Sequence, residues 1–439
     1  SKSMRDHATT SLLVKNDAGN IMGMITSARL RDSALIDLIP PTTPVKEVCL
    51  TDLISVDEND LMSQAMIKMV KHTINRVGVK RDDKVIGVLE LTDLLSFLSN
   101  HSYLLFLQVE RAKTLDELKE VAQSITKLTA FLMKSGTKIN IITRLISEVN
   151  QRLFAKIVQF ITPNEFEKNI CLLIMGSEGR REQVLRTDQD NALIFNDKID
   201  EKTAHLFANE FSSVLETFGF PPCPGRMMVS NPEWCLNLRD FKLKIFKWVT
   251  QPNEESMIAV SAFIDAVSAC GDNQLLREAK DYLQRCLQDN DSFFSLFAKA
   301  VDQFETPLGL FHRLKVEKGE HDGELDLKKG GIFIVVHGAR ALALKHKIHR
   351  TNTVRRLHAL ADQGILDRTF TNDLIDAFEF LRELKLKSSF NNNGEFTEAT
   401  NFVKIKRLHK LEKDLLKDSL QLVKEFKAVI VHHFNLGHF

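Results

Sequence analysis

Two short apolar segments joined by a polar stretch constrain the fold of this chain more than any other feature. They are Ile170 to Met175 and Asn191 to Phe195. Continuous apolar runs of this length, bounded by turn-forming residues, predict strands that are buried on both faces. Gly176-Ser177 follows the first run directly, and Asp188 and Asp190 lead into the second. The sequence therefore predicts two buried strands with these residues at their ends.

Gly176-Ser177 has the chemistry of a phosphate-binding turn. Glycine lets the backbone come close to a phosphate, and free N–H groups at the start of a helix attract its negative charge. The Ser177 hydroxyl adds a donor, and Arg180 and Arg181 add guanidinium groups that suit phosphate oxygens. Because Gly-Ser after a strand is also typical of an ordinary turn, the prediction depends on the acidic pair that follows.

Asp188 and Asp190 have the spacing of two ligands of one divalent cation. Residues two apart on a strand point to the same face, so the carboxylates lie close together and repel each other. A cation between them relieves the repulsion, and hard oxygen ligands favour Mg²⁺ or Mn²⁺, with triphosphate oxygens completing the coordination. An isolated Asp-x-Asp is common, but its combination with Gly-Ser and two strands is specific. We expect phosphoryl-type chemistry here.

The stretch 172–195 resembles the nucleotidyltransferase domain of bacterial proteins similar to PII-protein uridylyltransferase, in the polymerase-β superfamily. The likeness is carried by Gly-Ser-Glu-Gly-Arg-Arg-Glu-Gln at 176–183 and Thr-Asp-Gln-Asp-Asn at 187–191. It continues through 224–234 and 263–265 into the C-terminal part, and so covers nearly the entire chain. The resemblance implies transfer of a nucleoside monophosphate from a nucleoside triphosphate in a reaction that uses Mg²⁺ or Mn²⁺.

The resemblance also implies roles for residues outside this stretch. Asp265, after a strand expected at Ile258 to Ile264, is the expected third catalytic and metal-binding carboxylate, or else a strand-end residue. Val267 stands where the family has the arginine of an Asp-x-Arg motif. Asn231 either contacts the nucleotide or closes a turn. Lys328, in a C-terminal domain expected to fold over the active site, either reaches the triphosphate or is solvated.

The first hundred residues contain an internal repeat. Leu12 to Asp32 reads as strand, turn, strand and helix, and Val77 to Leu95 repeats this order. The second copy is preceded by a short strand near Leu53 and by a helix from Asp60, its expected N-cap, to His72. The first copy lacks this half, so the chain is expected to begin inside a domain.

This repeat resembles a tandem of cystathionine-β-synthase (CBS) domains, the first of them truncated. The resemblance implies adenosine-nucleotide binding between the copies, regulation of an attached enzyme, and homodimers. In the family's ribose-contacting pattern, the first copy keeps Thr26 but has Arg29 at the acidic position, and the second keeps Asp93 but has Glu90 at the hydroxyl position. Thr26 and Asp93 are the candidate ligand residues, and a purely structural pairing module is the alternative.

Helical periodicity accounts for the remainder. Apolar residues at spacings of three and four predict helices at Leu115 to Leu132, at Ile139 to Ile161, and from Leu275 to the end. Two apolar stripes are expected in the last part: Leu374, Ala377, Phe378, Leu381 and Leu384, then Leu408, Leu411, Leu415, Leu422 and Phe426. The expected fold is α+β, with a truncated CBS pair at 1–100, a helical connector at 101–165, a small mixed-sheet nucleotidyltransferase domain at 166–274 and a C-terminal helical bundle at 275–439.

Composition limits the expected partners. Lys and Arg total 59 against 58 for Asp and Glu, a formal net charge of +1, so the chain lacks the basic excess typical of nucleic-acid binding. The six cysteines have no zinc-type spacing, and no apolar run is long enough to span a bilayer. Free thiols fit a reducing compartment, so we expect a cytoplasmic protein with neither a membrane nor a nucleic acid as partner.

Three functions are compatible with these residues. The first is an enzyme that transfers a nucleoside monophosphate to a protein or small-molecule hydroxyl under control of the N-terminal module. The second is a non-catalytic regulator that retains the fold, binds nucleotide and signals to a partner. The third, addition of nucleotides to an RNA 3′ end, is disfavoured by the neutral charge. The intact Asp188 and Asp190 favour the enzyme.

Overall fold

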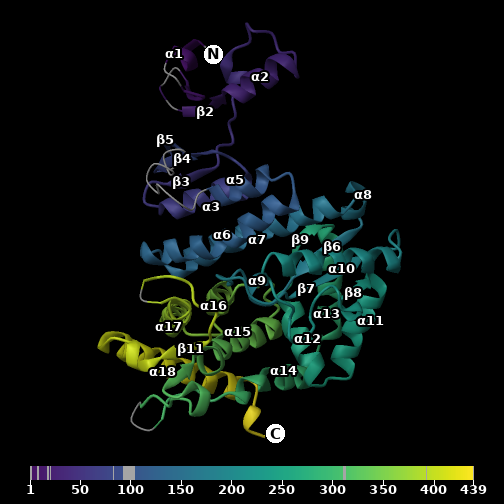
Figure 1. Cartoon of the computed structure of the whole chain (residues 1–439), viewed down its shortest axis with the longest axis vertical. Helices are drawn as coiled ribbons and strands as arrows, with labels where there is room; N and C mark the ends of the chain where they lie inside the picture. The colour runs from purple at the N-terminus through teal and green to yellow at the C-terminus, as the bar shows by residue number, and fades with distance from the viewer. Residues whose placement is uncertain are drawn as a thin grey trace. The chain divides into compact units, whose positions relative to one another are not determined.

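The computed structural model describes residues 2–6, 9–16, 19, 21–82, 84–91, 104–309, 313–391 and 393–438. The chain forms two compact units, Ser1–Tyr103 and Leu104–Phe439 (Figure 1). Helices and small mixed sheets occur in both units, which confirms the α+β architecture expected from the sequence. Within the described ranges, no helix is long and apolar enough to cross a membrane.

The first unit contains two small sheets. Its main elements are α1 (Lys2–Asp6), β1 (Ser11–Lys15), β2 (Ile21–Thr26), α2 (Ser27–Leu35), β3 (Ser55–Asp57), α3 (Met62–His72), β4 (Arg76–Arg81) and β5 (Lys84–Glu90). β1 and β2 form an antiparallel pair, and so do β4 and β5, while β3 lies parallel to β4. The predicted strand–turn–strand repeat is therefore confirmed in both copies.

Asp60 is not the N-cap of α3, because its Oδ2 accepts a hydrogen bond from the Asp57 N–H at 2.9 Å. Leu61 holds the N-cap position, without a side-chain hydrogen bond, so that prediction is wrong. The helix predicted from Thr92 lies outside the described residues, and so does Asp93.

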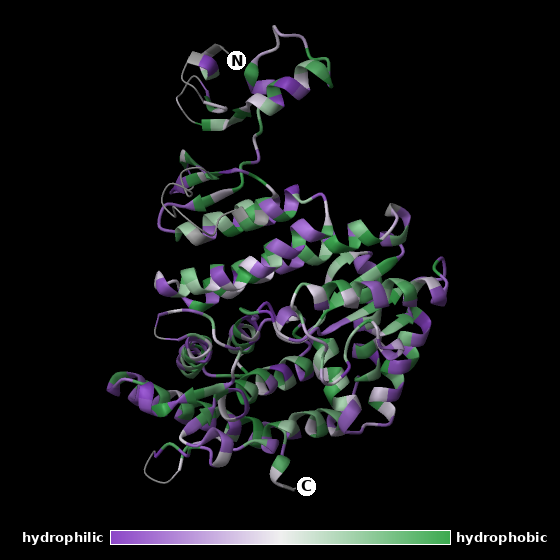
Figure 2. Ribbon diagram, viewed as in Figure 1, coloured by the Kyte–Doolittle hydropathy of each residue, from purple (hydrophilic) through white to green (hydrophobic). Residues whose placement is uncertain are grey.

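The second unit begins with the predicted helical connector. Its helices are α5 (Leu104–Arg111), α6 (Leu115–Lys134), α7 (Ile139–Ile161) and the short α8 (Asn164–Glu167). Thr114 caps α6 by accepting from the Glu117 N–H at 3.2 Å, and Gly136, with a φ of 73°, lies in the turn beyond its end. α6 and α7 pack against each other, and Figure 2 shows that each has hydrophobic and hydrophilic faces. Both predicted helices are confirmed.

A four-stranded sheet follows the connector. The elements of this region are β6 (Ile170–Ile174), α9 (Gly176–Gly179), β7 (Asn191–Phe195), α10 (Glu201–Thr217), β8 (Cys235–Asn237), α11 (Leu238–Thr250), α12 (Glu254–Ile264), β9 (Val267–Gly271) and α13 (Asn273–Cys286). The strand order is β8-β7-β6-β9, with β6 antiparallel to both neighbours and β7 parallel to β8. All residues of β6 and β7 are buried, so the two strands predicted first are confirmed.

The strand predicted at Ile258 to Ile264 is wrong, because these residues belong to α12. The helix starts at a capping box in which the side chains of Asn253 and Ser256 each accept from the other's backbone N–H. Its buried residues lie on one face, whereas Ile258 is 51% exposed. A short apolar run is compatible with a strand or a helix, and here the cap favours the helix.

The C-terminal part is a helical bundle that shares one core with the sheet. Its main elements are α14 (Asp291–Ala298), β10 (Glu324–Asp326), the π-helix η6 (Lys328–Ile332), α15 (Phe333–Lys345), α16 (Thr353–Asp362), α17 (Arg368–Ser388), β11 (Phe402–Lys404) and α18 (Lys410–His433). α15 is buried on all sides at its centre. The stripe predicted in α17 is buried, but Leu411 and Leu415 of α18 are 71% and 43% exposed. The buried face of α18 follows Leu416, Leu420 and Val423 and includes the predicted Phe426.

Candidate active site

The connection between β6 and β7 brings Asp190 against Gly176. The two strands pair with Ile174 opposite Asn191, and the Met175 N–H donates to the Asp190 carbonyl at 2.8 Å. Gly176 has a φ of 55°, and a Cβ at this position would lie 2.2 Å from Asp190 Oδ2. Only glycine fits, because any side chain would strain the backbone and displace the carboxylate. The predicted Gly-Ser turn and one predicted aspartate are thus in contact.

Asp188 and Asp190 form the acidic pair of this site. Both precede β7, which begins at Asn191, and Asp188 is exposed whereas Asp190 is half-buried. Burial raises the pKa of Asp190 to about 6, and the Asp188 carboxylate adds to this shift, while a hydrogen bond from the Cys223 thiol at 3.2 Å opposes it. Two mutually repelling carboxylates, one of them exposed, are hard oxygen donors that fit Mg²⁺ or Mn²⁺.

The remainder of the Gly-Ser turn is a single helical turn, α9. The half-buried Ser177 donates its hydroxyl to Gln183 Oε1 at 3.3 Å. A Cβ at Gly179 would lie 2.3 Å from the Asp265 carbonyl oxygen, so this position also requires glycine. The turn is therefore held by the Asp190 side chain at one end and by the Asp265 backbone at the other.

The Asp265 side chain does not join the acidic pair. It lies at the C-cap of α12, fully buried, and both of its oxygens accept hydrogen bonds from guanidinium groups. Arg180 Nη1 and Arg340 Nη2 are 2.7 and 2.6 Å from Oδ2, and Arg356 Nη1 is 2.7 Å from Oδ1. Burial alone would raise the pKa of Asp265, but the three arginines hold it far below its usual range. This geometry departs from the expected third metal ligand, because both oxygens are already occupied.

Arg180 belongs to the same buried ion network. Its Nε lies 2.8 Å from Glu182 Oε2, and Glu182 Oε1 accepts from the Thr353 N–H at 2.8 Å. The sequence predicts that Arg180 binds phosphate, whereas here two carboxylates occupy its guanidinium. Arg181 is exposed and donates to Gln151 at 3.2 Å. Within the described residues, no group of three or more His, Cys, Asp or Glu side chains could hold a metal ion.

Asn231 closes a turn in the loop before β8. It is the N-cap of a short helix, η2 (Pro232–Trp234). Its Oδ1 accepts from the Glu233 N–H at 3.2 Å, and its Nδ2 donates to the Arg226 carbonyl at 2.9 Å. Both polar ends of the side chain are used within the loop, which favours the turn over a nucleotide contact.

Two lysines of the C-terminal part act electrostatically on the acidic pair. Lys328 begins η6, where its N–H donates to Asp326 Oδ1 at 2.8 Å, and its charge acts on Asp190. Lys385 lies in α17, where burial and the charge of Lys328 lower its pKa to about 8, while Asp188 acts in the opposite direction. The sequence did not indicate Lys385, because a lysine on an amphipathic helix is typical of a solvated face.

Three family models match parts of the chain. Residues 123–255 match a model described as "Putative nucleotidyltransferase DUF294". Residues 291–434 match one described as "Putative nucleotidyltransferase substrate binding domain", and residues 45–100 match the CBS domain. The chain carries a CBS domain and both DUF294 domains. The acidic pair lies inside the first DUF294 match, whereas Asp265 lies between the two.

Among solved structures, an uncharacterized conserved protein from Pyrococcus horikoshii is 26% identical over 23% of this chain and 76% of its own length. Its TM-score of 0.22 is too low for any argument about the fold. No curated protein matches the chain.

Glu178 connects the Gly-Ser turn of the first DUF294 domain to α7. Its Oε2 accepts from Asn150 Nδ2 at 2.9 Å, and in the part of the chain that the structure describes its Oε1 has no hydrogen-bond partner. Burial raises the pKa of Glu178 to about 8, although the Asn150 hydrogen bond and the Arg181 charge oppose the shift. The side chain is therefore mainly protonated at neutral pH, where a buried neutral carboxyl costs less than a buried charge.

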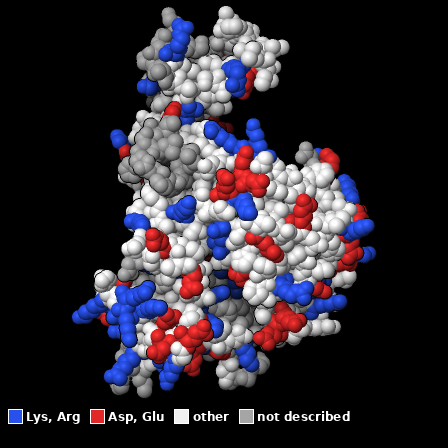
Figure 3. All heavy atoms as spheres, viewed as in Figure 1, with Lys and Arg blue, Asp and Glu red and all other residues white. Residues whose placement is uncertain are grey.

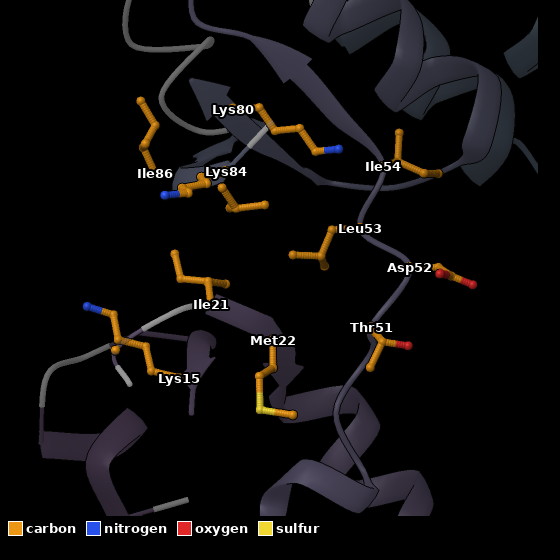
Figure 4. Close-up of a pocket in the computed structure, with 12 residues that line it drawn as sticks. Lys15, Ile21, Met22, Thr51, Asp52, Leu53, Ile54, Lys80, Lys84 and Ile86 are labelled. Carbon is orange, nitrogen blue, oxygen red and sulfur yellow. The ribbon is translucent and has the colours of Figure 1, made fainter. Parts of the chain in front are cut away.

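The CBS-containing unit has a cleft of its own, with a volume of about 960 Å³. Lys15 lies on one side of it, and Lys80 and Lys84 lie on the other (Figure 4). Thr26, the ligand residue expected from the first copy, is not among the residues that line the cleft, and its Oγ1 instead accepts from the Arg29 N–H at 3.0 Å as the N-cap of α2. The three lysines favour an anionic ligand.

Proposed function

We propose that the DUF294 domains transfer a nucleoside monophosphate from a nucleoside triphosphate to a hydroxyl of a protein or small-molecule acceptor. The reaction is uridylyl- or adenylyl-transfer, as the resemblance to PII-protein uridylyltransferase implies, and uses Mg²⁺ or Mn²⁺. One observation carries the proposal: Gly176, just after a buried strand, lies so close to the carboxylate of Asp190, beside Asp188, that no side chain would fit there.

In the proposed reaction, the acceptor oxygen bonds to the α-phosphorus, the bond from that phosphorus to the bridging oxygen breaks, and pyrophosphate leaves while the hydroxyl proton passes to solvent. Asp188 and Asp190 hold the divalent cation, which neutralises triphosphate charge when bound. The backbone and hydroxyl of Gly176-Ser177 bind phosphate oxygens, and Lys328 and Lys385 provide positive charge that acts on the acidic pair. Asp265 and Arg180 hold the turn in place.

The second candidate is a non-catalytic regulator that retains this fold and binds nucleotide. One observation favours it: the polymerase-β superfamily uses three carboxylates, whereas Asp265 is occupied by arginines and only two remain. Nucleotide addition to RNA has less support. Figure 3 shows basic and acidic side chains intermixed over the visible face of the second unit, and not one continuous basic band.

The test uses the full chain with each of the four labelled nucleoside triphosphates and Mg²⁺. We expect pyrophosphate release from the wild-type protein and a decrease of at least about 100-fold in Asp188→Ala and Asp190→Ala, the size seen when a group that stabilises transition-state charge is removed. Asp197→Ala, an exposed carboxylate just after β7, is the matched control and should leave the rate unchanged. Unchanged turnover in the Asp188 and Asp190 variants would contradict the enzyme. Nucleotide binding without pyrophosphate release would favour the regulator.

We also propose that the cleft of the CBS-containing unit binds an adenine nucleotide that regulates the DUF294 domains. The support is the group of lysines at Lys15, Lys80 and Lys84, whose charges suit the phosphates. Calorimetric titration of AMP, ADP and ATP into full-length Asp188→Ala, without divalent cations, measures binding, and a second titration with Lys80→Glu added identifies the part that belongs to this cleft. Lys80→Glu should weaken it about tenfold or more, and equal affinity in both proteins would contradict the assignment.

A further inference from the structure

At two places in the chain, two consecutive arginines direct their side chains in opposite directions, one into the protein and one toward its surface. In Arg180-Arg181 and in Arg355-Arg356, one member, Arg180 or Arg356, makes an ion pair with the buried Asp265. The other member, Arg181 or Arg355, is exposed. The inward guanidiniums are neutralised by carboxylates, so only the outward ones remain available to a ligand.

Arg144 of α7 lies near the two outward arginines. Arg181 Nη2 donates to Gln151 Oε1 at 3.2 Å, and Gln151 is two helical turns from Arg144 on the same side of α7. Asn352 donates to the backbone carbonyl just before Arg181 at 3.0 Å, which brings the first turn of α16, with Arg355, to the same place. In agreement with this geometry, burial and the charges of Arg355 and Arg181 lower the pKa of Arg144.

The charge of Arg181 acts on the buried Glu178, which is mainly protonated at neutral pH and so provides little counter-charge. Among the residues that the structure describes, no ion pair involves Arg144, Arg181 or Arg355. Like charges held close together without an acidic partner repel one another and oppose folding. Arg181 also adopts a φ of 57°, which is unfavourable for any residue with a side chain. Such an arrangement is typical of a site that an anion completes.

The cluster has different electrostatic neighbours from the acidic pair. The charges that act on Asp190 are those of Asp188, Arg180 and Lys328, whereas those that act on Arg144 are Arg355 and Arg181. Arg180, the residue just before Arg181, directs its largely buried guanidinium to Asp265. The outward arginines therefore form a separate surface.

We propose that Arg144, Arg181 and Arg355 form a second anion site, which binds a phosphate group of a small molecule. Guanidinium groups bind phosphate oxygens in a bidentate manner, and three of them match a pyrophosphate or a phosphate monoester. The three residues come from α7, from the turn after α9 and from α16. A bound phosphate therefore links the connector, the Gly-Ser turn and the C-terminal DUF294 domain. The site does not depend on nucleotidyl transfer.

The test is calorimetric titration of inorganic pyrophosphate into the full chain at low ionic strength with EDTA, which removes cation-dependent binding at the acidic pair. We expect saturable binding by the wild-type protein and affinities about tenfold lower in Arg144→Gln and in Arg355→Gln, as for loss of one charge-assisted hydrogen-bonded pair. Arg277→Gln is the matched control, because Arg277 is a lone exposed arginine of α13 without an ion pair in the described structure. It should bind like the wild-type protein.

Absence of pyrophosphate binding by the wild-type protein would overturn the proposal, and so would equal losses in Arg277→Gln and the two cluster variants. Urea unfolding checks that the variants fold: relief of repulsion should leave the midpoints of Arg144→Gln and Arg355→Gln unchanged or higher. Arg355→Lys, which keeps the charge but not the bidentate geometry, should bind more weakly than wild type and more tightly than Arg355→Gln; affinity below that of Arg355→Gln would also contradict the site. A failed transfer assay would leave these results unaffected.

Discussion

Asp188 and Asp265 are carboxylates of the same unit with opposite surroundings. Asp188 is exposed and lies near a second carboxylate, Asp190, whose pKa it helps to raise. Asp265 is fully buried, and three guanidinium groups occupy its oxygens. A carboxylate neutralised by arginines stabilises the fold, whereas a pair of carboxylates near the surface needs a cation. The difference separates residues that hold the Gly-Ser turn from those proposed to bind a ligand.

Replacing Asp265 tests whether this carboxylate stabilises the fold, and of the substitutions considered it is expected to have the largest effect. Asp265→Ala leaves buried guanidiniums without a counter-charge, so we expect the free energy of unfolding to fall by about 3–5 kcal/mol. Urea unfolding followed by circular dichroism measures it. Asp188→Ala is the control, because an exposed carboxylate changes stability by no more than about 0.5 kcal/mol. Similar losses in the two variants would break the comparison.

Glu178 shows what burial does to a carboxyl group that no arginine neutralises, because it is buried like Asp265 but has no guanidinium bound to it. Its pKa is about 8 in the folded protein against an ordinary value of 4.5, so the folded state holds the proton more tightly than the unfolded chain. This contribution to stability is fully present below about pH 4.5 and is lost as the pH rises through 8. At about 1.4 kcal/mol per pKa unit, the wild-type protein loses on the order of 4 kcal/mol between roughly pH 5 and pH 9.

Glu178→Gln removes this titration and leaves a neutral side chain beside Asn150. We expect a flatter pH profile of the urea midpoint than in the wild-type protein, with the variant the more stable of the two above about pH 8. Parallel profiles for the two proteins would show that Glu178 does not carry a buried proton.

Gly176→Ala tests whether Asp190 depends on its contact with the turn. The substitution places a Cβ 2.2 Å from Asp190 Oδ2 at a φ of 55°. Gly364→Ala is the matched control, because Gly364 has a φ of 71° but open space around a Cβ. Each alanine costs about 1–2 kcal/mol of backbone strain. Only Gly176→Ala should also lower the affinity for Mn²⁺. An equal loss of Mn²⁺ affinity in Gly176→Ala and Gly364→Ala would show that the contact between Gly176 and Asp190 does not position the carboxylate.

The smallest expected effect concerns Lys385. Lys385→Gln removes one positive charge near Asp188, so we expect KM for the nucleoside triphosphate to rise about tenfold, or roughly 1.4 kcal/mol, with little change in stability. Steady-state kinetics measure this effect. Lys387→Gln, on the same helix but more exposed, should leave KM unchanged. A change in kcat without a change in KM would place Lys385 in a different role.

The strands and the acidic pair could be predicted from sequence because their signals are local. The runs at β6 and β7, the Gly-Ser turn and Asp-x-Asp lie within one short segment, and the helical period of α6 and α7 is regular. The apolar run of α12 is short enough to fit a strand, and the capping residues Asn253 and Ser256, which favour the helix, lie outside that run. Local pattern alone could not decide between the two.

The partners of Asp265 could not be predicted in this way. Arg340 and Arg356 are 75 and 91 residues further along the chain, and only the packing of α15 and α16 against the sheet brings them to this carboxylate. The sequence shows that an aspartate is present but not what neutralises it. For the same reason Lys385, Arg144 and Arg355 had no sequence signal as members of a site, whereas Arg181 was predicted to bind phosphate.

Titration of Mn²⁺ in the presence of a non-hydrolysable nucleoside triphosphate, followed by electron paramagnetic resonance, is the most direct test of the acidic pair. The account predicts binding by the wild-type protein, a loss of affinity of at least about tenfold in Asp188→Asn and in Asp190→Asn, and wild-type affinity in folded Asp265→Asn. Absence of Mn²⁺ binding by the wild-type protein, or a loss confined to Asp265→Asn, would contradict it.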